Sequence, residues 1–280
     1  MVLSCIGRNL NKLAFYANLR HMSILKTPAE IAAMKEGGII LSRALRAATD
    51  ACVEGAHTKD LDAIARKSME DAGAKPSFLG YRIHGEGIPF PDTLCVSIND
   101  EVVHGMATPD RVIKKGDIVS LDIGCWYKDL CTDMATTVIV GETDEKTKAL
   151  VAATRESLVR ALSVVKAGRY IHEIGATIED FLTPQGYGIV RDLVGHGVGH
   201  AVHEEPQVPN YRERHAPKIK MLEGMVLAIE PMITIGDARV YMKDDQWTIV
   251  THKGNTCAHF EVTVAVTKSG YELITPWPDA

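Results

Sequence analysis

The chain of 280 residues contains the same helical pattern twice, and this repeat constrains its fold more than any other feature. A long helical pattern followed by a shorter one spans residues 27–73, and a second pair of similar lengths spans 144–186. This repeat indicates an internal duplication of a helix–helix–strand unit. A shift of 113 positions aligns Leu45 with Leu158, Ala48 with Ala161, Gly55 with Gly168, Leu61 with Ile174, Ala63 with Ala176, and Gly73 with Gly186.

Start signals mark the first two helical patterns. Thr27 as N-cap, Pro28 at the first helical position and Glu30 at the third form the pattern of a capping box. Thr58 is the expected N-cap of the second helix, which Gly73 closes. We therefore expect helices to follow these two threonines.

Strand-like segments rich in Val, Ile and Thr follow each helical pair. Helices in pairs and strands in blocks predict an α+β fold, with helices packed on one face of a mainly antiparallel sheet. The polar strand residues on the other face then decide the function. The segments lie at residues 93–98, 117–124, 134–141, 225–235, 247–250 and 259–267.

The composition excludes several classes of function. A formal charge of -5 and a pI near 6.1 give no basic surface for nucleic acid. No apolar run approaches the roughly 18 residues that span a bilayer, so we expect no membrane protein. Six cysteines without CxxC spacing argue against a disulfide framework and a zinc ribbon, and favour a reducing compartment. We therefore expect a cytoplasmic protein.

Asp122 and Asp133 lie on a predicted β-hairpin. Asp122 alternates with apolar residues, so its side chain projects from the polar face of its strand. A two-residue turn at Tyr127 and Lys128 would place the two aspartates directly opposite each other. Opposed like charges destabilise a hairpin, so either this face is fully solvated or a cation lies between the carboxylates.

Two glutamates add further acids to predicted strands. Glu230 lies in an apolar segment, where burial of an unpaired carboxylate is costly. Glu261 alternates with apolar residues and shares a face with His259 and Thr263. Either glutamate alone fits an edge strand with its polar side in water. Four isolated acids on central-looking strands together favour a cation site.

The segment DLVGHGVGHAVHEEP, residues 192–206, carries three histidines among glycines. His196 and His200 have the spacing of a helical zinc site, but the interleaved glycines disfavour a helix and no HExxH motif is present. The glycines instead permit a loop or bulge that brings one imidazole close to a site. One histidine with four carboxylates gives a mixed donor set whose charge two divalent ions would balance, which indicates a two-metal hydrolytic site.

The ordered set of Asp122, Asp133, GHGVGHAVHEEP, AIEPM and HFEVTV is similar to methionine aminopeptidases of type I, a peptidase family with the pita-bread fold. The resemblance covers Thr27 to Ile274. It implies an α+β fold of two pseudo-symmetric halves, with helices packed on a curved, mainly antiparallel sheet. This agrees with the internal repeat.

The resemblance implies a role for each acid and for one histidine. Asp122 and Asp133 would be metal ligands, with Asp133 bridging two ions. His196 and Glu230 would bind one ion, and Glu261 would bridge both. Glu230 would also accept a proton from the attacking water. His200 matches no ligand, and we expect a loop histidine.

The resemblance also implies a substrate site. His203 would bind the scissile carbonyl and its oxyanion, and His104 would contact the substrate near the scissile amide. Tyr81, Cys95 and Trp247 would line a pocket for the methionine side chain. Three features depart from the family pattern and make the preference for methionine a weaker expectation than hydrolysis: a longer segment at 82–94, Val202 in place of an aromatic residue, and Phe78 in place of cysteine.

The expected activity is metal-dependent removal of the N-terminal methionine from nascent proteins when the next residue is small. The cofactors would be two divalent ions per chain, of cobalt, manganese, iron or zinc, because carboxylates and imidazole suit all four. The rival functions are an X-Pro peptidase of the same fold and a non-catalytic pita-bread binding module. The expected partners are the N-termini of nascent polypeptides, with the ribosome as a further candidate.

Residues 1–22 are expected to be an N-terminal extension, and residues 23–280 a single catalytic domain. The extension carries Arg8, Lys12 and Arg20 but no acid, which is typical of a transit peptide and would direct the protein to an organelle. A start codon assigned too early, with Met22 as the true first residue, is the alternative. We expect the protein to be a monomer.

Overall fold

The computed structural model describes residues 24–82, 86–213 and 218–279, so the predicted extension at 1–22 lies outside the described residues. The helices fall into two pairs of a long and a shorter helix, as the sequence repeat predicts. No helix within the described ranges is long and apolar enough to cross a membrane. The helices are α2 (Pro28–Ala51), α3 (Thr58–Asp71), α4 (Glu145–Leu162) and α5 (His172–Leu182), followed by the short 3-10 helix η2 (Thr183–Gln185).

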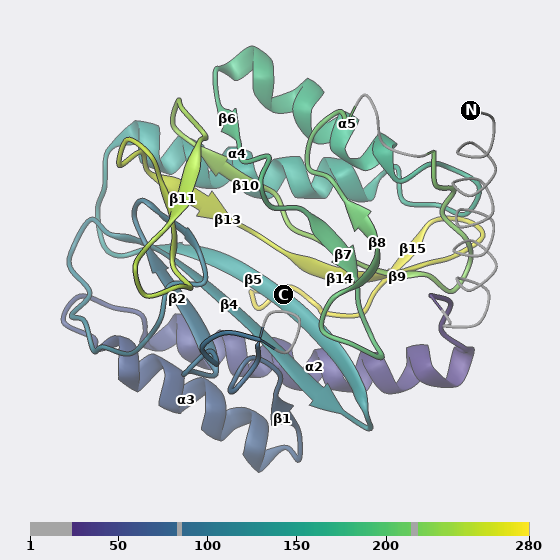
Figure 1. The fold of residues 1–280 in the computed structure, drawn as a ribbon, viewed down its shortest axis with the longest axis horizontal. Coiled ribbons are helices and arrows are strands. Elements are labelled where there is room, and N and C mark those ends of the chain that lie inside the picture. The colour runs from purple at the N-terminus through teal and green to yellow at the C-terminus, as the bar shows by residue number, and fades with distance from the viewer. Residues whose placement is uncertain (1–23, 83–85, 214–217, 280) are drawn as a thin grey trace, which may run out of the picture.

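The strands lie between the two helical pairs, α2–α3 on one side and α4–α5 on the other (Figure 1). They form four sheets, and every pairing between the described strands is antiparallel. The strands are β1 (Lys75–Pro76), β2 (Leu94–Ile98), β3 (Glu101–Val103), β4 (Ile118–Tyr127), β5 (Leu130–Ile139), β6 (Gly188–Ile189), β7 (Gly195–Gly197), β8 (Glu204–Val208), β9 (Val226–Ile229), β10 (Met232–Thr234), β11 (Val240–Met242), β12 (Ile249–Thr251), β13 (Cys257–His259), β14 (Val262–Val266) and β15 (Tyr271–Leu273).

The start of α2 follows the sequence prediction, but the start of α3 does not. The Thr27 hydroxyl caps α2 by accepting a hydrogen bond from the N–H of Glu30, and the Glu30 carboxylate accepts one from the N–H of Thr27. Thr58 is instead the first residue of α3, and His57 is the N-cap without a side-chain bond. The Thr58 hydroxyl is buried and donates to the carbonyl of Ala107. A tertiary partner therefore replaces the predicted cap.

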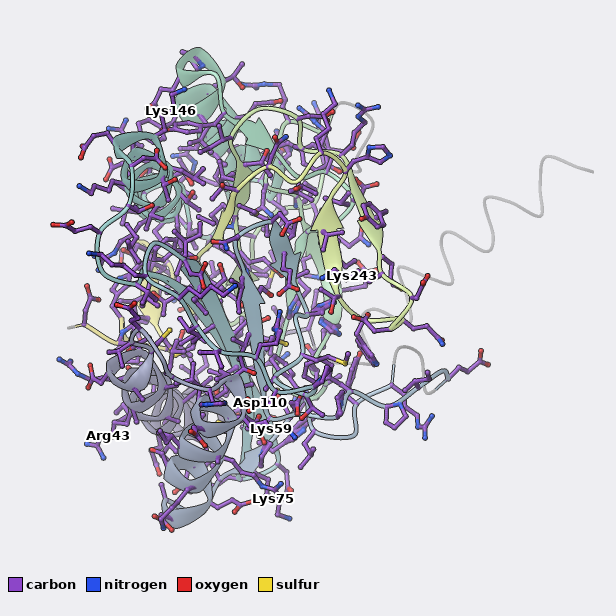
Figure 2. All side chains as sticks on the ribbon, turned by 90° about the vertical axis from the view of Figure 1, so that its left-hand side faces the viewer. Arg43, Lys59, Lys75, Asp110, Lys146 and Lys243 are labelled. Atoms are coloured by element: carbon purple, nitrogen blue, oxygen red, sulfur yellow. The ribbon has the colours of Figure 1, made fainter. Side chains whose placement is uncertain are left out.

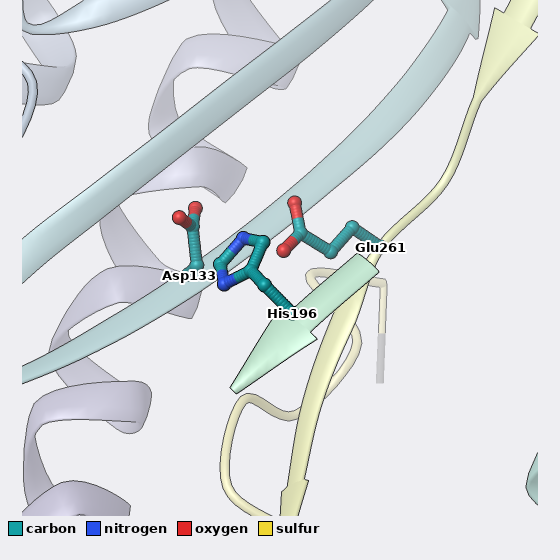
Figure 3. A group of neighbouring side chains, drawn as sticks. All are labelled: Asp133, His196 and Glu261. Carbon is teal, nitrogen blue, oxygen red and sulfur yellow. The ribbon is translucent and has the colours of Figure 1, made fainter. Parts of the chain in front are cut away.

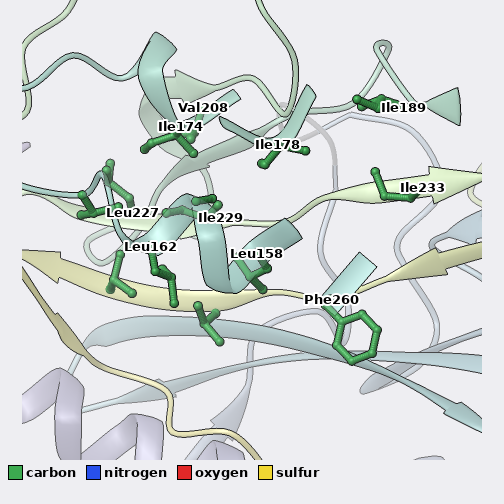
Figure 4. Close-up of a cluster of buried hydrophobic side chains, with 14 of the residues drawn as sticks. Leu158, Leu162, Ile174, Ile178, Ile189, Val208, Leu227, Ile229, Ile233 and Phe260 are labelled. Carbon is green, nitrogen blue, oxygen red and sulfur yellow. The ribbon is translucent and has the colours of Figure 1, made fainter. Parts of the chain in front are cut away.

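Each helical pair covers its own hydrophobic cluster. Leu41 and Leu45 of α2 pack with Leu61 of α3 against β2, β4 and β5. Leu158 of α4 and Ile174 of α5 belong to a second cluster, which includes residues of β9 and β14 and is drawn in Figure 4. Burial of apolar area on this scale is the main stabilising contribution. The outer faces of the helices carry exposed charged side chains such as Arg43 of α2, Lys59 of α3 and Lys146 of α4, which Figure 2 labels.

The hairpin of β4 and β5 turns one position later than the sequence predicts. Its central residues are Lys128 and Asp129, with φ of 50° and 61°. Two left-handed central residues are typical of a type I′ turn, whose twist matches that of the flanking strands. The predicted turn at Tyr127 and Lys128 is therefore wrong, because Tyr127 still pairs in the ladder with Leu130.

The later turn changes which residues face the two aspartates. Asp122 pairs with Ala135, and Asp133 pairs with Gly124. The prediction that Asp122 and Asp133 lie directly opposite each other is therefore wrong. The register differs by two residues, and because side chains alternate along a strand, a shift of two keeps both carboxylates on one face.

Candidate metal centre and substrate pocket

The five predicted metal ligands come from both halves of the repeat. Asp122 and Asp133 lie on β4 and β5, which follow the first helical pair. His196 lies on β7, Glu230 between β9 and β10, and Glu261 directly before β14, all after the second helical pair begins. Ala135 of β5 forms an isolated antiparallel bridge with Glu261, which joins the two halves at the centre. The centre therefore requires the whole fold.

Glycines allow His196 to reach the centre. The predicted absence of a helix here is confirmed, since Gly195–Gly197 is strand β7 and pairs with both β8 and β9. A Cβ atom at Gly195 would lie 2.4 Å from the carbonyl oxygen of Ala228, and one at Gly197 would lie 2.4 Å from that of Glu205. Only glycine fits between the neighbouring strands, so the motif brings the backbone of His196 into the sheet.

Asp133, His196 and Glu261 form one group of possible metal ligands, with one donor atom from each within 4.8 Å of the others. Figure 3 shows the imidazole of His196 between the two carboxylates. Glu230 and Glu261 form a second such group together with His259. Glu261 therefore belongs to both groups, as expected for a residue between two ions.

Glu230 lies between two imidazoles. One of its carboxylate oxygens is 3.5 Å from His196 Nε2, and the other is 3.7 Å from His259 Nε2. Asp122 is buried but belongs to neither group of possible ligands. The structure therefore brings four of the five predicted ligands into compact groups and leaves Asp122 beside them.

Burial and crowding disfavour the ionised form of all four acids. Burial raises the pKa of Asp122 to about 7. Burial, followed by the charges of Glu261 and Asp122, raises the pKa of Asp133 well above its usual range. Burial and neighbouring acids likewise raise the pKa of Glu230 and of Glu261. No lysine or arginine among the described residues pairs with these four acids.

His196 and His104 are held in the neutral form. Burial lowers the pKa of His196 to about 3, helped by the nearby His203, and lowers that of His104 to about 4. Nδ1 of His196 lies 2.8 Å from the carbonyl oxygen of Gly197. When Nδ1 donates to this carbonyl, Nε2 is the nitrogen with a lone pair toward Asp133 and Glu261. Neutral imidazole is the form that binds metals.

Several buried polar atoms at the centre have no hydrogen-bond partner among the described residues. They include Oδ1 of Asp122, Oδ1 of Asp133 and Oε1 of Glu261. Buried polar atoms are almost always paired, so this set is exceptional. Oxygen and imidazole nitrogen donors that face one another without protein partners fit divalent cations.

The residues predicted to line the pocket for the substrate side chain form one apolar cluster. Cys95 and Trp247 are buried in one cluster, and Tyr81 packs against it. Phe90 belongs to the same cluster, and its ring contacts that of Trp247 edge-on at 5.2 Å between centroids. The indole of Trp247 donates to the carbonyl of Ile88. The longer segment at 82–94 therefore supplies part of this pocket.

The two departures from the family pattern near this pocket lie in one cluster. Val202 is buried with Phe78, Tyr81 and Trp126 packed against the same cluster. Phe78 also packs against the cluster of Phe90. Compared with the family pattern, residue 78 is larger and residue 202 is smaller. The total apolar volume of the cluster that both residues join is thereby conserved, and hydrophobic cores tolerate such exchanges.

His104 and His203 both lie near the pocket. His104 follows β3 with φ of 57°, and its ring lies 6.1 Å from that of Trp247. The His203 ring lies 4.5 Å from that of His196, edge to face. Nδ1 of His203 shares a hydrogen bond of 2.8 Å with the Tyr81 hydroxyl. The predicted substrate residues therefore adjoin both the metal ligands and the pocket.

His200 is separate from the metal-ligand groups, as expected. Its Nε2 lies 2.8 Å from a carboxylate oxygen of Glu30 on α2. Its backbone N–H donates to Glu204, whose side chain also pairs with Lys26. The buried Lys26–Glu204 pair joins the start of the described chain to the loop that carries His203.

Sequence reasoning missed two residues of the site, Phe90 and His259. Phe90 lies in the segment treated only as a departure from the pattern. His259 was noted for sharing a face with Glu261 and received no role. Its position two residues before Glu261 was the available signal, because side chains two apart along a strand point the same way.

Comparison with known proteins agrees with this site. The model of the family described as "Metallopeptidase family M24" matches residues 32–268 of the chain. The chain belongs to this family. It is 39% identical over 255 residues to the methionine aminopeptidase of Clostridium acetobutylicum, covering 91% of this chain and 99% of that one. It is 40% identical over 255 residues to methionine aminopeptidase 1 of Bacillus subtilis, again covering 91% of this chain and 99% of that one. The resemblance predicted from the sequence is thereby confirmed.

Solved structures confirm the predicted α+β pita-bread architecture. The methionine aminopeptidase of Thermotoga maritima superposes with a TM-score of 0.85 at 42% identity, covering 90% of this chain and 98% of that one. The prolidase of Pyrococcus furiosus superposes with a TM-score of 0.73 at 26% identity, but this chain covers only 67% of it. The methionine enzyme is thus similar over nearly its whole length.

Proposed function

We propose that the protein is a metal-dependent aminopeptidase that removes the N-terminal methionine from polypeptides when the next residue is small. The observation that carries this proposal is the convergence of unpaired carboxylates and imidazole beside an apolar cluster. The methionine aminopeptidases to which the chain is similar support methionine as the residue removed. Both halves contribute side chains to the centre, so we propose that they form one catalytic domain.

The residues present fit two divalent cations. Asp122, Asp133, His196, Glu230 and Glu261 would hold them, with Glu261 shared by both ligand groups. Bound divalent ions would polarise the peptide carbonyl and lower the pKa of water, which provides a nucleophile near neutral pH. Carboxylate and imidazole donors suit Mn(II), Fe(II), Co(II) or Zn(II).

We propose that Glu230 accepts a proton during hydrolysis. Its side chain is only 13% exposed, and burial with the charges of Asp122 and Asp133 raises its pKa. A carboxylate of raised basicity takes a proton from water more readily than an ordinary one. His196 and His259 on either side restrict the carboxylate to the centre.

His203 would stabilise the developing oxyanion. If the Tyr81 hydroxyl donates to Nδ1, the proton of the neutral ring lies on Nε2, which is then a donor for the scissile carbonyl. His104, with its pKa lowered to about 4, stays neutral and would hydrogen-bond the substrate amide. Cys95, Trp247 and Tyr81 would enclose the methionine side chain in an apolar pocket, with Phe90 as an additional wall.

The first test is release of methionine from Met-Ala-Ser and Met-Leu-Ser by chelator-stripped protein, with and without Mn(II), Fe(II) or Co(II). We expect cleavage of Met-Ala-Ser only when metal is added, and little cleavage of Met-Leu-Ser. Cleavage of an Ala-Pro peptide in place of the methionine peptide would support the X-Pro rival. No cleavage with any metal would support the binding-module rival.

A further inference from the structure

His259 is a buried residue of the centre to which neither the family resemblance nor the mechanism gives a role. It ends β13 and pairs with Met232 of β10. Its backbone is fixed further by Thr137, which accepts from its N–H at 2.9 Å and donates to its carbonyl at 2.7 Å. The side chain is therefore held in place by two strands, with 1% of the residue exposed.

Neither ring nitrogen of His259 has a hydrogen-bond partner among the described residues. A buried imidazole without any partner is costly, and such groups are rare in folded proteins. Its nearest charged neighbour is Glu230, at 3.7 Å from Nε2, which is too long for a hydrogen bond. The contact therefore does not satisfy the ring.

The same distance is right for two ligands that share a metal ion. Donor atoms about 2.1 Å from one ion lie about 3 to 4.2 Å from each other, depending on the angle between them. One donor atom each from Glu230, His259 and Glu261 lies within 4.8 Å of the others. His196 has the corresponding place in the other group, with Asp133 and Glu261.

We propose that His259 is a sixth protein ligand of the centre, binding through Nε2 the ion held by Glu230 and Glu261. Glu230 also lies 3.5 Å from His196 Nε2, and the family resemblance assigns His196 and Glu230 to one ion, so this ion would have two imidazoles, His196 and His259. This inference rests on the metal binding of the proposed function, and it is independent of the peptide substrate. A second imidazole favours zinc, cobalt and iron at that ion over magnesium and calcium, which prefer oxygen donors.

The first experiment counts coordinated imidazoles in the wild-type protein. Histidine side-chain resonances are recorded by ¹H–¹⁵N NMR on apoprotein and after addition of two equivalents of Zn(II). We expect two imidazoles to take up the shifts of zinc-bound nitrogen. No coordinated imidazole would contradict the proposed function itself. A single one, lost in His196→Gln, would contradict only the role of His259.

Three variants, His196→Gln, His259→Gln and His200→Gln, are used to assign the resonances, and their metal affinities are measured by calorimetry. His259→Gln should remove one coordinated resonance and weaken the binding of one ion by at least tenfold, the lower range for loss of even an outer-shell partner. His200→Gln is the matched control, because His200 contacts Glu30 outside the centre. It should bind both ions as tightly as wild type. Equal affinity of the His259 variant and this control for both ions would overturn the proposal.

Discussion

Glu101 and Asp133 are both buried carboxyl groups of the first half, and they differ in whether cationic side chains pair with them. Arg111 binds both oxygens of Glu101 at 2.7 and 2.9 Å, and Lys243 and the N–H of Ile98 also donate to it. Burial alone would raise the pKa of Glu101, but these partners outweigh it, and the pKa is lowered. Among the described residues no cationic side chain pairs with Asp133, and its pKa is raised.

The difference separates a structural acid from a functional one. The protein itself supplies the positive charge around Glu101, and Arg111 also donates to the carbonyls of Val96 and Met106, so the network ties β2 to the segment after His104. Around Asp133 the positive charge has to come from outside the chain. Burial alone does not mark a site, whereas burial without a partner does.

The largest effect is expected from Asp133→Asn. Hydrolysis should fall by more than about 100-fold, the upper range for loss of an outer-shell partner, because a carboxylate of the proposed ligand set is removed. The metal-free variant should unfold at a urea concentration no lower than wild type, since asparagine has the shape of the protonated acid. Asp129→Asn, at the tip of the same hairpin, is the control and should keep full activity. Wild-type turnover by metal-loaded Asp133→Asn would refute its role.

The next effect concerns a residue that adjoins the acids but holds no ion. His203→Ala should lower kcat by about 10²–10³, as measured for the loss of one oxyanion donor. Its metal affinity should stay within a few-fold of wild type in calorimetry. Tyr81→Phe should show a smaller loss in kcat, because it removes only the partner of Nδ1. An unchanged kcat in His203→Ala would show that the carbonyl binds elsewhere.

Arg111→Met should lower stability, whereas Asp133→Asn should lower activity and leave stability unchanged. Arg111 binds both oxygens of the buried Glu101, and its removal leaves Lys243 as the remaining cationic partner, so the free energy of unfolding should fall by about 3 kcal/mol. Urea denaturation of the metal-free protein measures this change, and Arg43→Met on the exposed face of α2 is the control, with an expected change below about 0.5 kcal/mol. Equal stability of the two variants would remove the distinction drawn between Glu101 and the site acids.

The two kinds of acid should also differ in their response to pH. Asp122 keeps a proton in the folded apoprotein below its pKa of about 7, and a metal ion has to displace that proton. Metal affinity should therefore fall as pH falls below 7, by about tenfold per pH unit for each proton displaced. Calorimetry in buffers of different ionisation enthalpy should show more protons released at pH 6 than at pH 8. The same release at both pH values would contradict the raised pKa.

Glu101 provides the contrast in that experiment. Its pKa is lowered, so it is ionised in the folded protein across this pH range and releases no proton when metal binds. Glu101→Gln should therefore leave the proton release unchanged while it lowers stability. A change in proton release in this variant would show that the Glu101 network and the centre are coupled.

Local patterns gave reliable predictions where neighbouring residues in the sequence decide the structure. The capping box of Thr27 and Glu30 formed because both partners lie within one turn of helix. The glycines around His196 excluded a helix for a local reason, their backbone freedom. Thr58 and the hairpin turn were mispredicted because a distant carbonyl of Ala107 and the twist of the β4–β5 ladder decided them.

The fold class, the duplication and the four acids of the centre could be predicted from the amino-acid sequence, because periodicity and ordered motifs follow from the order of residues along the chain. Which buried acids have partners depends on the tertiary structure. Arg111 lies ten residues from Glu101, and Lys243 lies 142 residues away, so their pairing depends on how the strands pack. The position of His259 beside Glu230 also depends on strand packing. The pairing of β13 with β10, which follows Glu230 in the chain, brings the two residues together, and neither the AIEPM nor the HFEVTV motif specifies that pairing.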